Sequence, residues 1–332
     1  MRDPSFWWRA PGPMAGLLAP LGALYGVIAA RRLMQAGERA RVPVICIGNL
    51  TVGGAGKTPT AIAVARLLQA AGVRPMFLTR GYGGRLGGPV AVAPAHGAAD
   101  VGDEPLLLAR VAPTIVARDR AAGARAAEAA GAEFIVMDDG FQNPALAKDL
   151  SLIVVDGRRG LGNGKVFPAG PLRAPLRPQI ARAQALLVVG EPGPAAQPAI
   201  DGARARGLPV FTGRLVPDPA VVAALAARPA LAFAGIADPE KFFAALRGAG
   251  VAVRATQAFP DHHRFAAAEQ DDLFTRADRG GLALVTTEKD LARMQGDPAL
   301  AALARRATAL PVALSFDDAG LIGRLLAAVR AA

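Results

Sequence analysis

The chain has 332 residues, of which 52% are apolar and 20% charged, a composition typical of a folded globular protein. Its single cysteine, Cys46, excludes a disulfide framework and a cysteine-built metal site, and its three histidines disfavour a histidine-built one. The 38 basic and 27 acidic residues give a formal charge of +11, carried mainly by arginine. A chain this basic suits an anionic membrane, a phosphorylated substrate or nucleic acid.

The amino-terminal segment is apolar and flanked by arginine. Residues 10–30 carry no charge, and Leu17, Leu21, Leu24 and Ile28 fall on one side of a helix. Three arrangements remain open: a helix lying on an anionic membrane surface, a transmembrane anchor, and a helix packed on a domain. A cleaved signal peptide is disfavoured, because a nucleotide-binding motif that needs cytosolic ATP follows roughly 20 residues later.

Short apolar runs alternate with helical patterns along the next part of the chain. This alternation predicts a parallel sheet covered by helices. We expect a long functional loop over 157–185 and a linker over 190–208, because both stretches are rich in Gly and Pro. The predicted strands are 42–47, 74–78, 114–117, 134–137, 152–155 and 186–189, and the predicted helices are 57–71, 104–111 and 118–130.

A second alternating run starts after about residue 225. It comprises predicted strands at 230–234, 251–255, 282–286 and 312–316, with helices at 238–248, 266–279, 288–294 and 319–331. We therefore expect three parts: an apolar, basic, membrane-associating helix over 1–40, a core over 41–215, and a smaller α/β domain over 225–332 that closes over the site.

A glycine-rich phosphate loop lies between the first predicted strand and its helix. It reads Thr51-Val52-Gly53-Gly54-Ala55-Gly56-Lys57-Thr58. In this context the backbone N–H groups surround phosphate oxygens, Lys57 reaches the β- and γ-phosphates, and the Thr58 hydroxyl ligates Mg²⁺. Thr51 stands where the strict pattern has glycine, so the match is imperfect. The motif predicts nucleotide binding.

A carboxylate that helps to hold the metal should end a neighbouring strand. Two runs of four apolar residues end in aspartate, one at Asp138 and Asp139 and the other at Asp156. The doubled carboxylate favours Asp138 and Asp139, although each of these aspartates could simply cap a turn. The sequence does not decide which of the pair contacts the metal.

Several blocks in order resemble the tetraacyldisaccharide 4'-kinase family. They run from residue 48 to residue 290, and together they are more specific than any one of them. The blocks are Gly48–Pro59, Thr79–Gly83, Val101–Pro105, Asp138–Gln142, Pro168–Arg173, Phe233–Ile236, Phe259–Phe265 and Thr286–Asp290. The family pattern is broken after Gln142, where Asn143 stands in place of histidine, and after Arg173, where Ala174 replaces glutamate, so those two family roles are not carried over.

The resemblance implies a P-loop NTPase sheet with helices on both faces, and a kinase that uses ATP and Mg²⁺. Its acceptor would be the 4'-hydroxyl of a tetraacylated glucosamine disaccharide 1-phosphate, a precursor of lipid A. It also implies work at the cytoplasmic face of an inner membrane, against an anionic surface. We expect no nucleic-acid partner, because no helix-turn-helix, RRM or zinc pattern is present. No protein partner is evident.

The same resemblance assigns roles to individual residues. Asp103 would activate the acceptor hydroxyl and His262 would orient Asp103, although on sequence alone Asp103 could cap a helix and His262 could be an ordinary loop residue. Further contacts to metal or to substrate phosphate are implied for Asp138, Asp139, Glu104, Arg80, Arg120 and Arg173, with a structural role equally open for each arginine.

Two other functions compete with this interpretation. A membrane-associated switch ATPase with a deviant P-loop would carry a second lysine before the paired glycines, and this chain has Val52 there. A P-loop kinase of a soluble metabolite would not need the apolar amino-terminal segment. Stimulation of ATP turnover by the dispersed glycolipid would separate these possibilities.

Overall fold

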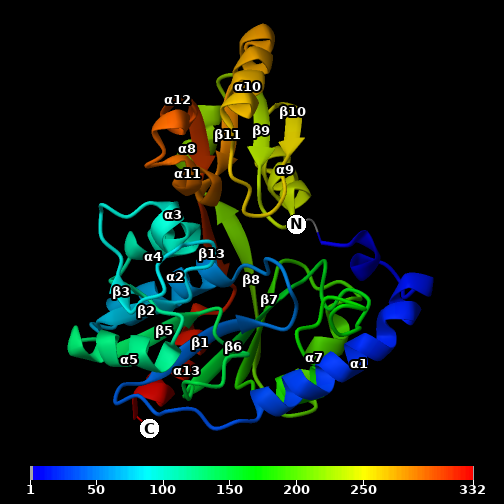
Figure 1. Cartoon of the computed structure of the whole chain (residues 1–332), viewed down its shortest axis with the longest axis vertical. Coiled ribbons are helices and arrows are strands. Elements are labelled where there is room, and N and C mark those ends of the chain that lie inside the picture. The colour runs from blue at the N-terminus through cyan, green and yellow to red at the C-terminus, as the bar shows by residue number, and fades with distance from the viewer. Residues whose placement is uncertain (1–2, 332) are drawn as a thin grey trace.

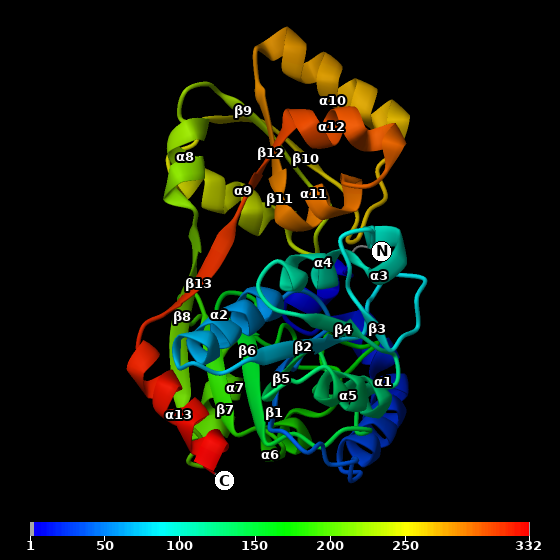
Figure 2. The ribbon, with the colours of Figure 1, turned by 90° about the vertical axis from the view of Figure 1, so that its left-hand side faces the viewer.

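The computed structural model describes residues 3–331, which form a larger and a smaller domain placed end to end, each built around one sheet (Figures 1 and 2). The larger sheet has the strand order β13-β8-β7-β6-β1-β5-β2-β4-β3. Its seven inner strands are parallel, and β3 and β13 pair antiparallel at its two edges. The strands are β1 (Val44–Asn49), β2 (Pro75–Thr79), β3 (Val90–Ala91), β4 (Thr114–Val116), β5 (Phe134–Asp138), β6 (Leu150–Asp156), β7 (Ala185–Val189), β8 (Val210–Pro217) and β13 (Val312–Phe316).

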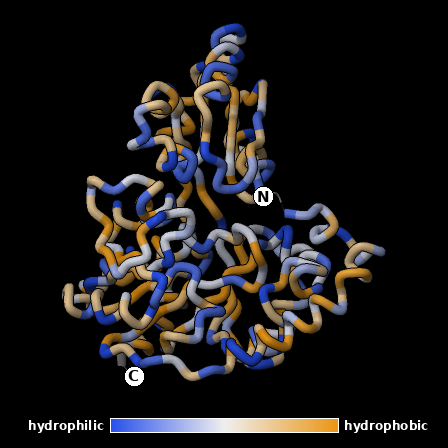
Figure 3. Tube along the Cα trace, viewed as in Figure 1, coloured by the Kyte–Doolittle hydropathy of each residue, from blue (hydrophilic) through white to orange (hydrophobic). Residues whose placement is uncertain are grey.

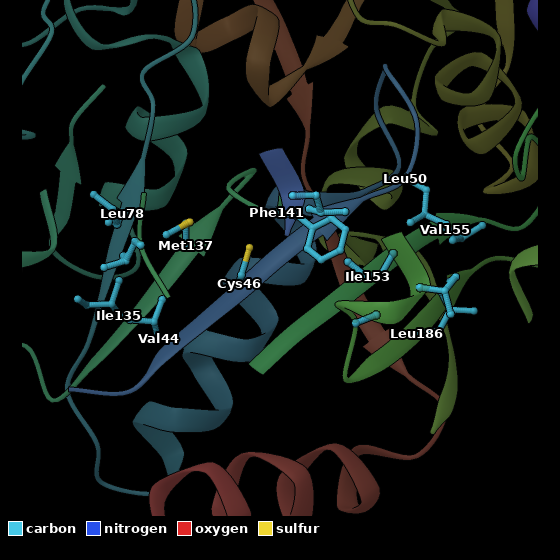
Figure 4. Packing of buried hydrophobic residues seen from close by; sticks show 14 of the residues in the cluster. Val44, Cys46, Leu50, Leu78, Ile135, Met137, Phe141, Ile153, Val155 and Leu186 are labelled. Carbon is cyan, nitrogen blue, oxygen red and sulfur yellow. The ribbon is translucent and has the colours of Figure 1, made fainter. Parts of the chain in front are cut away.

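Both faces of the larger sheet are buried, as expected when side chains alternate along fully covered strands. In β1, Cys46 faces one core together with Met137 and Ile153, while Ile47 faces the opposite core (Figure 4). The first core contacts α5 (Arg120–Ala129), α6 (Leu176–Ala181), α7 (Gln197–Arg204) and the end of α1 (Pro13–Leu33). The second core contacts α2 (Lys57–Ala70), α4 (Asp103–Ala109) and α13 (Ala319–Ala331).

The smaller sheet is all parallel, with the order β10-β9-β11-β12. Its strands are β9 (Ala230–Ala234), β10 (Val253–Ala258), β11 (Ala283–Thr287) and β12 (Ala307–Leu310). Its helices are α8 (Pro219–Leu225), α9 (Pro239–Gly248), α10 (Ala267–Gly280), α11 (Glu288–Met294) and α12 (Ala301–Arg306). Three short helices complete the elements: Ser5–Trp8, α3 (Ala98–Val101) and Pro298–Leu300. The predicted parallel sheet, helical layers and smaller α/β unit are thus confirmed.

The sequence-based boundary of the smaller domain is wrong at its carboxyl end. Strand β13, expected in that domain, pairs with β8 in the larger sheet, where Leu314 lies opposite Leu215. Ile322 and Leu326 of α13 then pack in a core of the larger sheet. The chain therefore leaves the larger sheet through β8 and returns through β13, and this antiparallel pair joins the two parts (Figure 2).

The two glycine- and proline-rich stretches are more ordered than their composition suggested. The expected loop over 157–185 contains α6, and the expected linker over 190–208 contains α7. Ala199, Ile200 and Ala203 of α7 are buried in the core beside α6. The linker prediction is wrong, because small alanine side chains let a short helix pack closely on the sheet despite its polar, Gly-containing sequence.

Helix α1 lies along the larger domain with one side buried and the other exposed. Ala15, Gly22, Gly26 and Leu33 are buried, whereas the predicted stripe of Leu17, Leu21, Leu24 and Ile28 is 53–75% exposed. The trace of α1 is mostly in the orange of hydrophobic residues (Figure 3). Among the described residues, α1 is the one helix long and apolar enough to cross a membrane by length and composition.

Two alanine substitutions in α1 test whether the helix packs on the domain in solution. A Cβ at Gly22 would lie 2.8 Å from the carbonyl oxygen of Val166, whereas Gly16 has no neighbour within 4 Å. We expect Gly22→Ala to lower the free energy of unfolding by about 1–3 kcal/mol. Gly16→Ala should raise it by about 0.5–1 kcal/mol, because alanine favours the helix. Thermal unfolding of both variants measures the contrast, and equal stabilisation by the two would contradict the packed arrangement.

Candidate active site

The phosphate loop joins β1 to α2 at the carboxyl edge of the larger sheet. Gly53 and Gly56 have φ values of +101° and +90°, which glycine adopts without strain. The Lys57 side chain is nearly buried, with its Nζ 3.4 Å from the Gly53 carbonyl oxygen. Asn49 Nδ2 donates to the same carbonyl oxygen at 3.1 Å. The loop is therefore already curved around the position of a phosphate, with a lysine ammonium inside it.

Arg173 holds this loop from the opposite side. Its Nε donates to the Thr51 carbonyl oxygen at 2.9 Å, and its two terminal nitrogens bind both carboxylate oxygens of Asp139 at 2.9 and 3.1 Å. The backbone N–H of Val52 donates to the Pro171 carbonyl oxygen at 2.7 Å. In this conformation most of the Arg173 donors are bound to protein groups, so the side chain orders the nucleotide loop.

The geometry distinguishes the two adjacent aspartates. Thr58 Oγ1 donates to Asp138 Oδ2 at 3.0 Å, and the other oxygen, Asp138 Oδ1, is buried without a hydrogen-bond partner among the described residues. Burial, aided by the nearby charge of Glu104, raises the pKa of Asp138 to about 7. In contrast, burial would raise the pKa of Asp139, but Lys57 and Arg173 outweigh that effect and lower it.

Asp138 and Thr58 together fit a divalent cation. The Asp138 Oδ1 atom is buried without a hydrogen-bond donor, so it is available to bind a cation. Mg²⁺ typically uses one or two protein ligands beside phosphate and water oxygens. No group of three His, Cys, Asp or Glu side chains within residues 3–331 forms a complete metal cage. Asp139 is the less well placed ligand in this conformation, since both of its oxygens already accept a hydrogen bond from Arg173.

The competing aspartate, Asp156, is used elsewhere. Its Oδ1 accepts from the backbone N–H groups of Arg158 and Arg159, and its Oδ2 pairs with Lys241 of α9. Asp156 therefore links the larger sheet to the smaller domain. Nearby, Asp238 pairs with Arg158 and Arg159 across the same junction.

Asp103 and His262 meet between the two domains, as predicted. Asp103 begins α4 and is 3% exposed, and its Oδ2 lies 3.4 Å from His262 Nδ1. Its Oδ1 accepts from the Glu104 backbone N–H at 2.9 Å. Burial would raise the pKa of Asp103, but the His262 hydrogen bond and the charges of Lys289 and Arg293 outweigh it and lower that pKa. The surroundings of the buried Asp103 carboxylate thus favour its ionised form.

Two basic residues of α11 hold the acidic side chains at this point, and neither role was predicted from the sequence. Arg293 Nε donates to Asp103 Oδ2 at 2.8 Å, and its Nη1 lies 3.0 Å from Asp290 Oδ1. Lys289 Nζ lies 2.5 Å from Glu104 Oε1. Lys289 falls in a block that resembles the family, which could have drawn attention to it, whereas Arg293 lies outside every such block.

Unusual backbone geometry also concentrates here. Within residues 3–331, the non-glycine residues with positive φ are Asp139 at 55° and His262 at 53°. Aspartate and histidine tolerate this region better than most residues, but such conformations persist only where surrounding contacts hold them. His262 is held by its backbone N–H, which donates to Gly235 O at 3.1 Å, and by the Tyr82 ring, whose centroid is 4.8 Å away.

The remaining two arginines are placed very differently. Arg80 directly follows β2 and its side chain is exposed, so it is free to meet a ligand. Arg120 is 2% exposed and donates to the Ala117 carbonyl oxygen at the start of α5. The expected substrate contact of Arg120 is therefore not available in this conformation, because the side chain is enclosed in the domain.

Titration of His262 tests the pairing directly. Burial alone would lower the pKa of His262, but the bond to Asp103 outweighs it and raises that pKa. The pairing therefore adds stability that is fully present below about pH 6.5, the ordinary histidine value, and is lost as pH rises through the raised pKa. We expect NMR titration of the imidazole, assigned with His262→Gln, to show a pKa above the ordinary value that falls in Asp103→Asn. An unchanged pKa in that variant would contradict the pairing.

Comparison with known proteins identifies the family. The sequence profile described as Tetraacyldisaccharide-1-P 4'-kinase matches residues 14–330. The chain is 58% identical to a tetraacyldisaccharide 4'-kinase of Nitrobacter hamburgensis, covering 98% of this chain and 97% of that protein. It is equally 58% identical to one of Methylobacterium sp. (strain 4-46), covering 99% and 98%. A crystal structure of the "apo" form of LpxK from Aquifex aeolicus in complex with ATP is 27% identical, with a TM-score of 0.71, covering 95% of this chain and 99% of that one. The chain belongs to the tetraacyldisaccharide-1-P 4'-kinase family.

Proposed function

We propose that this protein transfers the γ-phosphate of ATP to the 4'-hydroxyl of a tetraacylated glucosamine disaccharide 1-phosphate. Membership of the family supports this substrate. The observation that carries the proposal is the meeting of two parts: a phosphate loop with Lys57 inside it, and a buried Asp103 carboxylate held between the domains by His262. The first part suits a nucleotide, and the second suits a hydroxyl that must lose a proton as its oxygen is phosphorylated.

The nucleotide phosphates would bind to the backbone N–H groups of residues 51–58, and Lys57 would contact the β- and γ-phosphates. Thr58 and Asp138 would hold Mg²⁺, which when bound would neutralise negative charge on the transferred phosphoryl group. In this arrangement Arg173 and Asp139 keep the loop in place, and neither contacts the metal. Glu104 stays paired with Lys289 in the conformation described.

Asp103 would accept the proton of the acceptor hydroxyl. A sugar hydroxyl is a weak nucleophile, so a positioned carboxylate favours attack as the new bond forms. Arg293 and His262 both hold Asp103 Oδ2, and His262 could take up positive charge as a proton arrives there. Arg293 is thus a positioning residue, because its contacts are to Asp103, Asp290 and the His263 carbonyl oxygen.

The two-domain arrangement would protect this step from water. Residues 218–311 lie between β8 and β13 in the chain, and α11 of this part packs on α4 of the core. Closure around the bound nucleotide would favour transfer to the sugar over hydrolysis. The exposed Arg80 is placed to contact the acceptor, and its guanidinium suits a phosphate.

The acylated substrate places the enzyme at a membrane, and α1 is suited to lie on one. Eight of the eleven large hydrophobic residues that are exposed in the described chain belong to residues 14–34. An exposed apolar patch of this kind marks a membrane or partner surface. Because Gly22 and Gly26 pack on Val166 and Pro175, a helix in this position lies flat rather than crossing the bilayer. We infer that the protein works at the anionic, cytoplasmic face of the inner membrane, where ATP is available.

A kinase assay with three acceptors tests the function. Labelled ATP and Mg²⁺ are offered with the detergent-dispersed acylated disaccharide 1-phosphate, with its deacylated form, or with detergent alone. We expect label on the acylated lipid, weaker transfer to the deacylated sugar, and little ATP turnover without an acceptor. Equal turnover in all three would favour a switch ATPase, and transfer to the deacylated sugar alone would favour a soluble substrate.

A further inference from the structure

A cavity of about 450 Å³ lies at the opposite end of the larger sheet from the phosphate loop. It is bounded by the segment that follows α1, by the loop before β6, and by the start of β6 and β7. Its volume falls within the roughly 300–1,000 Å³ typical of small-ligand sites. We call it the basal cavity and define it by Met34, Arg39, Phe141, Lys148 and Arg182 among its lining residues.

The basal cavity is lined mainly by positive charge. Three cations line it, Arg39, Lys148 and Arg182, and no aspartate or glutamate does so in the part of the chain that is described. Asp149 lies just outside the lining, 3.9 Å from an exposed terminal nitrogen of Arg39, so Lys148 and Arg182 carry the argument. Lys148 Nζ donates to the backbone carbonyl oxygen of Asn143, a partner that leaves its charge unneutralised. Burial and the like charges of Arg182 and Arg120 lower the pKa of Lys148. An anion in the cavity would relieve this repulsion.

The basal cavity also continues the exposed apolar stripe of α1. Leu17, Leu21, Leu24 and Ile28 are followed on the same side of α1 by Arg31, and Gln35, two residues beyond the end of the helix at Leu33, lines the cavity. Met34, which is 57% exposed, lines it as well. On a membrane surface along which α1 lies, an exposed apolar stripe with a group of cations beside its end can meet acyl chains and a headgroup phosphate at the same time.

We propose that the basal cavity binds the phosphate headgroup of an anionic phospholipid in the membrane on which α1 lies. Lys148 would contact the phosphate from within, and Arg39 and Arg182 would form forked hydrogen bonds to it. The exposed Met34 would pack against the apolar part of the lipid. This assignment rests on the proposed membrane surface, but not on the chemistry at the phosphate loop, which lies at the far edge of the sheet.

Vesicle flotation tests the proposal. The full-length protein is mixed with phosphatidylcholine vesicles that contain or lack phosphatidylglycerol. We expect the anionic lipid to strengthen binding of the wild type, and Lys148→Gln/Arg182→Gln to reduce this gain by about 10- to 30-fold, since each cation near the surface contributes about 1 kcal/mol. The matched control, Arg254→Gln/Arg279→Gln, removes the same charge from exposed positions of the smaller domain and should retain most of the gain.

Further variants separate the possible failures. Leu21→Asp/Leu24→Asp should lose binding to both kinds of vesicle, whereas the double variant in the cavity should keep wild-type binding to neutral vesicles and a wild-type unfolding midpoint. The proposal would be overturned if phosphatidylglycerol strengthened vesicle binding of the cavity variant as much as that of the wild type. Loss of the gain on adding millimolar inorganic phosphate at constant ionic strength would assign the cavity to free phosphate and overturn the headgroup assignment. Flotation does not involve turnover, so a wild type that binds anionic vesicles but phosphorylates nothing would refute only the proposed function.

Discussion

Replacing Asp103 with asparagine is expected to lower kcat by about 10²–10⁴-fold, the usual contribution of a positioned general base. Asparagine keeps the shape of the side chain and can still accept from the Glu104 backbone N–H, which Asp103 Oδ1 does at 2.9 Å. It cannot take the hydroxyl proton, and it removes the negative charge that Arg293 and His262 both face. Because Asp103 lies outside the phosphate loop, affinity for ATP should change little.

Single-turnover kinetics and ATP titration of the same protein separate the two effects. The matched control is Asp100→Asn in α3, where the carboxylate pairs with Arg85 instead of the site. Arg293→Gln should lower kcat less than Asp103→Asn and should shift the pH dependence of kcat/KM, because it changes how Asp103 is held. A normal turnover number in Asp103→Asn would remove this residue from the reaction, and a loss equal to that of Asp100→Asn would indicate a structural effect.

The order of elements could be predicted because it depends on local patterns. Apolar runs bounded by turn residues identified most strands of both sheets but missed β3, β8 and β12. The glycines before Lys57 identified the phosphate loop in its strand-loop-helix context. The destination of the last strand could not be predicted in this way. An apolar run such as Val312–Phe316 fits an edge of either sheet, and only tertiary pairing with β8 decides between them.

The sequence motifs identified which segments form the site, but they did not identify which side chains contact one another there. Strands β5 and β6 flank β1 on its two sides, so the pattern of apolar residues and aspartate allowed both Asp138 and Asp156, and only the doubled carboxylate favoured Asp138 and Asp139. The hydrogen bond from Thr58 and the unpartnered oxygen of Asp138 distinguish them, and both depend on side-chain geometry. Arg120 shows the same limit, since its burial follows from packing that no local motif encodes.

Lys57→Met is expected to lower kcat by about 10²–10³-fold and to weaken ATP binding. Lys57 is 8% exposed, and its Nζ lies 3.4 Å from the Gly53 carbonyl oxygen and 3.6 Å from Asp139 Oδ2. When ATP is bound, this ammonium would stabilise the charge that develops on the transferred phosphoryl group, and removing one such donor typically costs that much. Methionine keeps the unbranched apolar stem in its buried channel, so the substitution removes the charge without leaving a large cavity.

The fold should tolerate this change, because Asp139 keeps both hydrogen bonds from Arg173 after Lys57 is replaced. We therefore expect a small shift of the unfolding midpoint together with a large loss of turnover, measured by single-turnover transfer and by calorimetric ATP titration. Arg66→Ala is the matched control, since it removes one positive charge from an exposed position of the same helix. Comparable losses in the two variants would mean that the net charge of α2, rather than an ammonium inside the phosphate loop, governs nucleotide binding. A Lys57→Met enzyme with wild-type turnover would show that the loop does not hold the transferred phosphate.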